Sequence, residues 1–114
     1  MWDMQTRVAE FDADRFRSLG PGYVALSLAG EVGELANEIK KIWRADPAIG
    51  LPGGFAAVPS EYLPRITDEI ADVLLLSIVL SNHLGIDVER ALLDKLAVID
   101  QRLREGHYGA EATS

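Results

Sequence analysis

The chain has no cysteine and only two histidines among its 114 residues. Without cysteine, neither a disulfide framework nor a thiolate metal site is possible, and the sequence fits a reducing compartment. Neither His83 nor His107 follows a glutamate by three positions, which is the spacing that carboxylate-bridged di-iron bundles use. A di-iron centre therefore ranks far below a site built from oxygen ligands alone.

Basic residues are also in short supply, because 11 lysines and arginines face 18 acidic residues and the formal net charge is -7. Such a chain is a poor match for duplex DNA or an anionic membrane, since basic surface supplies most of the attraction in both cases. An anionic small substrate is not excluded, because bound cations would invert the local sign of an acidic site. We expect no nucleic-acid partner and no membrane partner.

Long hydrophobic runs are missing as well. The longest apolar stretch, from Ile70 to Leu80, is interrupted by Asp72 and Ser77 and is too short to cross a bilayer as a helix. The first residues lack the basic start and apolar run of a signal peptide. We therefore expect a cytoplasmic protein.

No segment shows the alternation of polar and apolar residues that marks a strand, so the sequence predicts an all-α fold with four main helices. We expect a single domain over residues 1–114. The predicted helices cover residues 2–19, 23–44, 60–83 with Ser60 as N-cap and Gly85 at the end, and 88–104 with Asp87 as N-cap. Between them we expect a loop at about 46–59, and after them a frayed tail at 107–114.

The third predicted helix is apolar on every side between Ile66 and Leu84. A helix of this kind is buried all round, and a single four-helix unit of this size can hardly enclose one of its helices completely. The sequence therefore predicts a helical oligomer, most simply a two-fold dimer whose interface includes this helix.

Two acidic pairs are the most informative feature that is present. Glu31 and Glu34 are three positions apart on the second predicted helix, and Glu69 and Asp72 have the same spacing on the third. Residues three apart share a helix face, so packing the two helices together would gather four carboxylates. Buried carboxylates repel one another and are costly to desolvate. A hard divalent cation relieves that cost, and we expect Mg²⁺, with Mn²⁺ as a substitute.

A solvated acidic face is the competing interpretation of the same residues, with Glu69 and Asp72 as favourable charges near a helix N-terminus. Gly30 and Gly33 bear on the choice, because a glycine inside a helix costs about 1 kcal/mol relative to alanine. We interpret the two glycines as positions where a ligand or another helix approaches closely.

At these residues the chain resembles the MazG-like all-α nucleoside triphosphate pyrophosphohydrolases, over about residues 20 to 105. The resemblance is carried by Leu28-Ala29-Gly30-Glu31-Val32-Gly33-Glu34-Leu35, Glu38, Lys40-Lys41, Asp68-Glu69-Ile70-Ala71-Asp72-Val73-Leu74, Leu84-Gly85-Ile86-Asp87, Lys95-Leu96 and Arg102. Either acidic motif alone would not be specific for this family, whereas the two motifs in this order are quite specific for it.

The resemblance implies a helical bundle that works as a homodimer or a dimer of dimers. It implies hydrolysis of a nucleoside triphosphate between the α and β phosphates, which yields the monophosphate and pyrophosphate. It also implies magnesium ions between the two acidic helices, with Glu31, Glu34, Glu69 and Asp72 matching the family's metal ligands. Because many members carry a further glutamate where this chain has Gly30, any role of that glutamate is in doubt here, and Glu38 could take part of it. A downstream asparagine of many members is not evident either.

The remaining roles follow from the chemistry of the residue types. Glu31 or Glu38 would accept the proton of the attacking water. Lys41 and Lys95 are candidates for phosphate oxygens, and Trp43 is a candidate for stacking on the base. Each has a simpler alternative: an ion pair between Lys41 and Glu38, a solvated Lys95, and a Trp43 that belongs to the core or an interface.

Two further questions stay open at this level. The segment from Ile49 to Pro59 would close over the substrate or serve only as a linker. The whole chain could also be a non-catalytic regulatory or structural module with the same fold. The base and the sugar of the substrate are not specified by the sequence.

Overall fold

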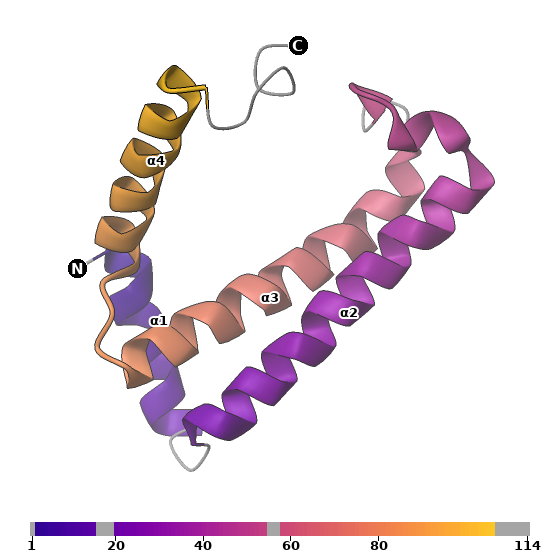
Figure 1. Ribbon diagram of the computed structural model, residues 1–114. Coiled ribbons are helices and arrows are strands. Elements are labelled where there is room, and N and C mark those ends of the chain that lie inside the picture. The colour runs from indigo at the N-terminus through magenta and orange to yellow at the C-terminus, as the bar shows by residue number, and fades with distance from the viewer. Residues whose placement is uncertain (1, 16–19, 55–57, 107–114) are drawn as a thin grey trace.

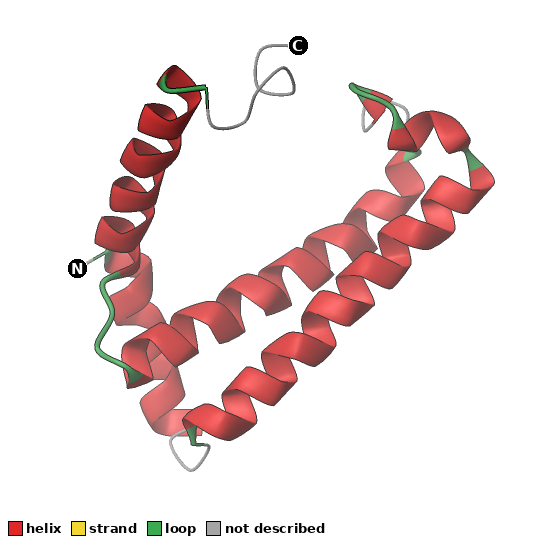
Figure 2. Ribbon diagram, in the orientation of Figure 1, coloured by secondary structure: helices red, strands yellow, loops and turns green. Residues whose placement is uncertain are grey.

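The computed structural model describes residues 2–15, 20–54 and 58–106. These residues form four α-helices and no strand, which confirms the all-α prediction (Figures 1 and 2). The helices are α1 (Asp3–Arg15), α2 (Pro21–Ala45), α3 (Leu63–His83) and α4 (Val88–Arg104). The predicted tail at 107–114, and the predicted end of the first helix at 16–19, lie outside the described residues.

The ends of the helices show how proline and aspartate set their bounds. α2 begins at Pro21, two residues before the predicted start, since proline is well suited to the first helical position. The prediction that Ser60 caps the third helix is wrong. Ser60–Tyr62 forms a 3₁₀ turn, and α3 begins at Leu63 with Pro64 in its first turn, where a missing N–H costs nothing.

Gly85 ends α3, as the sequence predicts. It lies one position after the C-cap Leu84 and has a φ of +70°, a conformation that favours glycine. The Ile86 N–H donates to the Ser81 carbonyl at 2.8 Å and the Gly85 N–H donates to the Asn82 carbonyl at 3.3 Å. These two bonds form a Schellman motif, which turns the chain sharply towards α4.

α2 and α3 lie side by side along most of their lengths, and α1 crosses the end where α2 begins and α3 ends (Figure 1). The core lies at this junction, where Val8, Val24, Ile78 and Val79 are buried. Burying each such side chain contributes roughly 1.5–3 kcal/mol. The junction therefore packs α1, α2 and α3 together at one end of the α2–α3 pair.

The predicted loop at about 46–59 is partly ordered as a 3₁₀ helix at Pro47–Gly50. The Asp46 carboxylate begins it by accepting a hydrogen bond from the Ala48 N–H at 3.0 Å. A Cβ atom at Gly50 would collide with the indole of Trp43, so only glycine allows this close approach. Residues 55–57 of the predicted loop lie outside the described part.

α4 runs away from the α2–α3 pair (Figure 1) and contains no buried residue. Leu92, Leu93 and Leu96 are each more than half exposed. The Cα radius of gyration is 17.4 Å, against about 13 Å for a compact domain of this length. A single chain therefore leaves apolar surface open to solvent.

α3 is not enclosed within one chain, although the sequence predicts a helix buried on all sides. Ile78 and Val79 are buried, whereas Ile70 and Leu74 are 42% and 55% exposed. No single helix among the described residues is long and apolar enough to cross a membrane. Residues 60–83 and 88–104 have the length and composition to do so only together, as a pair bent by 105°.

Candidate metal centre

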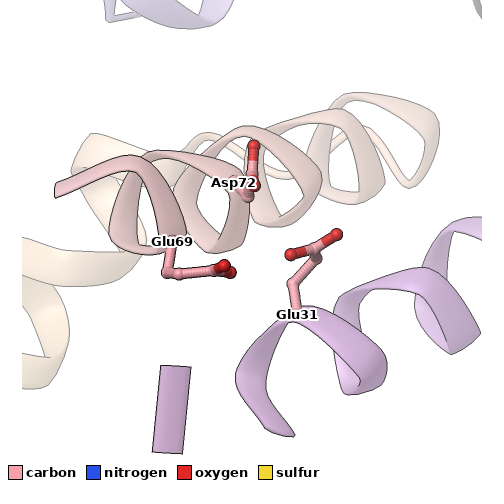
Figure 3. A group of neighbouring side chains, drawn as sticks. All are labelled: Glu31, Glu69 and Asp72. Carbon is pink, nitrogen blue, oxygen red and sulfur yellow. The ribbon is translucent and has the colours of Figure 1, made fainter. Parts of the chain in front are cut away.

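Three of the four predicted metal ligands meet between α2 and α3. Glu31 extends from α2 towards Glu69 and Asp72 of α3 (Figure 3), and one carboxylate oxygen from each lies within 4.8 Å of the other two. All three side chains are half-buried. The i, i+3 spacing places Glu69 and Asp72 on one face of α3, and the packing of α2 along α3 brings Glu31 opposite them.

Two oxygens of this cluster have no hydrogen-bond partner within the described residues. They are Oε2 of Glu31 and Oε2 of Glu69, and both atoms are buried. An unsatisfied buried polar atom costs roughly 1–3 kcal/mol, and more when it is charged. The two oxygens therefore favour a ligand that neutralises them.

The electrostatics of the cluster agree with its geometry. Partial burial, followed by the charges of Glu34 and Asp72, raises the pKa of Glu31 from 4.5 to about 7. Partial burial, followed by the charge of Glu34, also raises the pKa of Glu69. Without a cation, the cluster cannot carry its full negative charge at neutral pH.

Glu34 lies beside the cluster but outside the group of three. Its charge acts on both Glu31 and Glu69, yet its side chain is exposed. The structure therefore places three predicted ligands together and leaves Glu34 at their edge.

Glu38 lies two turns along α2 from Glu31 and is held by basic side chains. Its Oε1 atom is 3.5 Å from Lys41 Nζ and 3.5 Å from Arg65 Nε. The contact with Lys41 is the ion pair that the sequence analysis gives as the simpler alternative to a phosphate contact of this lysine. Arg65 is a neighbour that sequence reasoning missed, because the contact depends on how α3 is rotated against α2.

The other candidate substrate residues lie away from the carboxylates. Trp43 is 53% exposed, packs over Gly50 and lines a hollow of about 420 Å³ with Ile39, Ile49, Leu51 and Pro52. Twelve residues of helix separate Trp43 from Glu31, or about 18 Å. Lys95 lies on α4, which one chain does not bring to the cluster (Figure 1). Their proposed roles stay predictions.

No other helix of the described part of the chain approaches Gly30 or Gly33 closely. A Cβ atom at either position would meet nothing within 4 Å among the described residues. Close packing of another helix therefore does not explain the two glycines within the described part of one chain. Room for a ligand stays a prediction.

Comparisons with known proteins show which family the chain resembles. The family model of the MazG nucleotide pyrophosphohydrolase domain matches residues 21–104. The chain is similar to dCTP pyrophosphatase 1 of Rattus norvegicus, with 34% identity over 94 residues. It is 33% identical to dCTP pyrophosphatase 1 of Mus musculus over 94 residues. Each match covers 82% of this chain and 51% of the relative, so the chain spans about half the length of these relatives.

Proposed function

Since the chain belongs to the MazG nucleotide pyrophosphohydrolase domain family, we propose that it hydrolyses nucleoside triphosphates to the monophosphate and pyrophosphate. The observation that carries the proposal is the meeting of Glu31, Glu69 and Asp72 between α2 and α3. A solvated acidic face, the competing interpretation, would not bury carboxylate oxygens without partners.

The cluster suits a hard divalent cation, because its donors are all carboxylate oxygens. One carboxylate oxygen from each of the three residues lies within 4.8 Å of the other two, so one small cation could contact all three residues. Glu31, Glu69 and Asp72 would hold Mg²⁺, or Mn²⁺ in its place, and Glu34 would complete the set from the edge. When bound, the cation supplies charge neutralisation on the phosphate oxygens and a water of lowered pKa.

Within the chain, Glu31 is the better of the two candidate proton acceptors. It belongs to the cluster, whereas Glu38 is engaged by Lys41 and Arg65. Lys41 is 68% exposed and its contact with Glu38 is long, at 3.5 Å. Because the Lys41 end of this pair lies in solvent, Lys41 could turn to a phosphate oxygen while Arg65 keeps its contact with Glu38.

Assembly with a second copy would cover the apolar residues that one chain exposes on α3 and α4. Leu74 is 55% exposed and Leu96 is 62% exposed, and a two-fold interface would bury both at once. In a dimer or a dimer of dimers, α4 of one copy would bring Lys95 to the cluster of the other. This arrangement would let Lys95 contact a phosphate bound at the cluster of the other copy.

Pyrimidine deoxynucleotides are the first substrates to test, because the rat and mouse relatives are named for dCTP. The experiment is a panel of canonical and modified nucleoside triphosphates with Mg²⁺, with the products separated. We expect monophosphate plus pyrophosphate. Diphosphate plus orthophosphate would refute the cleavage position, and no product from any triphosphate would favour the non-catalytic module.

A matched pair of variants tests the site. Glu69→Gln removes a cluster ligand, whereas Asp68→Asn changes the neighbouring carboxylate, which is exposed on α3. Metal-assisted catalysis is worth several kcal/mol, so we expect E69Q to lose roughly 100-fold or more in kcat/KM. D68N should stay close to the parent. A folded E69Q protein with the parent's rate would refute the assignment.

A further inference from the structure

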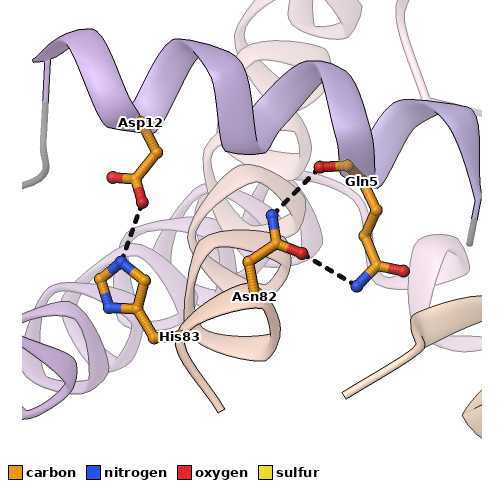
Figure 4. Close-up of polar contacts among 4 residues, drawn as sticks. All are labelled: Gln5, Asp12, Asn82 and His83. Atoms are coloured by element: carbon orange, nitrogen blue, oxygen red, sulfur yellow. Dashed lines mark hydrogen bonds and ion pairs between the residues drawn. The ribbon is translucent and has the colours of Figure 1, made fainter. Parts of the chain in front are cut away.

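Gln5 of α1 is completely buried, which is unusual for a glutamine. It lies against the C-terminal end of α3 (Figure 4). The Gln5 Nε2 donates to Asn82 Oδ1 at 3.0 Å, and Asn82 Nδ2 donates to the backbone carbonyl of Gln5 at 3.1 Å. These two bonds tie the start of α1 to the end of α3.

The same side chain also reaches the turn between α3 and α4. Its Nε2 donates to the Ile86 carbonyl at 2.6 Å, and its Oε1 accepts from the Val88 N–H at 2.9 Å. Val88 is the first residue of α4, and the first N–H groups of a helix have no partner within it. Asp87 caps the Arg90 N–H at 3.2 Å. The first turn of α4 is therefore capped by two side chains, one of them from α1.

Little other packing fixes the direction of α4. None of its residues is buried, and Trp2, Glu89, Leu92 and Leu93 border an open hollow of about 270 Å³ between the N-terminal residues and α4. The hydrogen bonds of Gln5 thus join the turn at 84–87 to α1 and α3 at the point where the chain bends by 105°.

We propose that Gln5 is a positioning residue that sets the direction of α4 relative to the α2–α3 pair. Its importance for hydrolysis depends on the proposed function, because α4 carries Lys95 and the apolar face that would meet a second copy. α1 precedes the segment that the family model matches, which begins at residue 21.

Asp12 and His83 provide a matched control. They form a second link between α1 and α3, with His83 Nε2 at 2.8 Å from Asp12 Oδ2 and both side chains mostly buried (Figure 4). This link does not touch the turn at 84–87. Asp12→Asn should therefore loosen α1 without releasing α4.

Spin-label distances test the proposal directly. The chain has no cysteine, so Lys40→Cys on α2 and Arg102→Cys on α4, both exposed positions, can be labelled selectively. Labelled protein is diluted with unlabelled protein, so that only distances within one chain are recorded. The parent should give one narrow distribution. Gln5→Leu should broaden it roughly twofold or more, as expected for local release of an element.

The D12N variant should keep the parent's narrow distribution despite a lower unfolding midpoint. A folded Q5L protein with the parent's distribution would overturn the proposal, and so would a D12N distribution as broad as that of Q5L. The measurement needs no nucleotide. If the chain hydrolyses nothing, the proposed function fails while the result on α4 stands.

Gln5→Glu serves if Q5L does not fold. Ionised glutamate keeps an oxygen acceptor for the Val88 N–H but cannot donate to Asn82 or Ile86. Hydrogen exchange of the Val88 amide is then measured beside the distance distribution. A broad distribution with an exposed Val88 amide supports the proposal, and a narrow distribution in folded Q5E overturns it. A broad distribution with a protected amide overturns it as well.

Discussion

At the scale of single residues, the site depends on carboxylates that are placed where their charge is unfavourable. Glu31 and Glu69 each have a buried oxygen without a partner among the described residues, and both have a raised pKa. A cation between α2 and α3 would remove both costs at once. The residues that weaken the metal-free fold are thus those proposed to act in the holoprotein.

This arrangement predicts a pH dependence of the metal-free protein. The pKa of Glu31 rises from 4.5 to about 7 on folding. Between these values the folded state binds more protons than the unfolded state, so Glu31 makes the free energy of unfolding fall as the pH rises from about 4.5 to about 7. Urea unfolding with EDTA at pH 5 and pH 8 measures the difference. This difference in the free energy of unfolding should be smaller in Glu31→Gln. An unchanged difference would contradict the raised pKa of Glu31.

Residue spacing predicted part of the site and not the rest. The i, i+3 pattern is local, so it was enough to place Glu69 and Asp72 together and to suggest Glu31 as their neighbour. The exposed position of Glu34 and the contact of Arg65 with Glu38 depend on the rotation of α2 against α3. The bonds between Gln5 and Asn82 join residues 77 positions apart, and no local pattern predicts them.

At the scale of helices, capping residues decide where each element begins. The predicted bounds of α4 agree with the structure because Asp87 accepts a hydrogen bond from the Arg90 N–H and Gly106 follows its end with a φ of +75°. The start of α3 was predicted less well, since Ser60 can cap a helix but here begins a 3₁₀ turn.

The cap of α4 gives the second prediction. Asp87→Ala should lower the free energy of unfolding by about 1 kcal/mol, because it leaves a helix N-terminal N–H without its acceptor. Asp94→Ala is the control. It removes an exposed ion pair with Arg90, which should change the stability by less than about 1 kcal/mol. Urea unfolding of both variants checks this, and equal losses would contradict the capping role.

At the scale of the whole molecule, the open arrangement of α4 is the main feature. The described chain has one small core at the junction of α1, α2 and α3, and large apolar side chains on α3 and α4 stay exposed. The sequence predicted an oligomer because apolar residues lie on every side of the third predicted helix. It could not specify how copies meet, because that depends on surfaces from helices far apart in the chain.

The third prediction concerns this exposed face. Leu96→Glu places a charge in the proposed interface, where burying it would be costly, so the protein should shift from dimer or tetramer to monomer. Gln101→Glu, on the opposite side of α4, adds the same charge and should leave the mass unchanged. Light scattering after size-exclusion chromatography measures both. A monomeric parent, or an unshifted L96E, would rule out this interface.

The central claim is that Glu31, Glu69 and Asp72 jointly hold a divalent cation. Its most direct test is a titration with Mn²⁺, followed by electron paramagnetic resonance in the absence of nucleotide. The parent and D68N should bind the ion with the same affinity, and Mg²⁺ should compete with it. E69Q should bind it roughly 10-fold or more weakly, since one of three clustered ligands is lost. Equal Mn²⁺ binding by the parent and a folded E69Q protein would contradict the account.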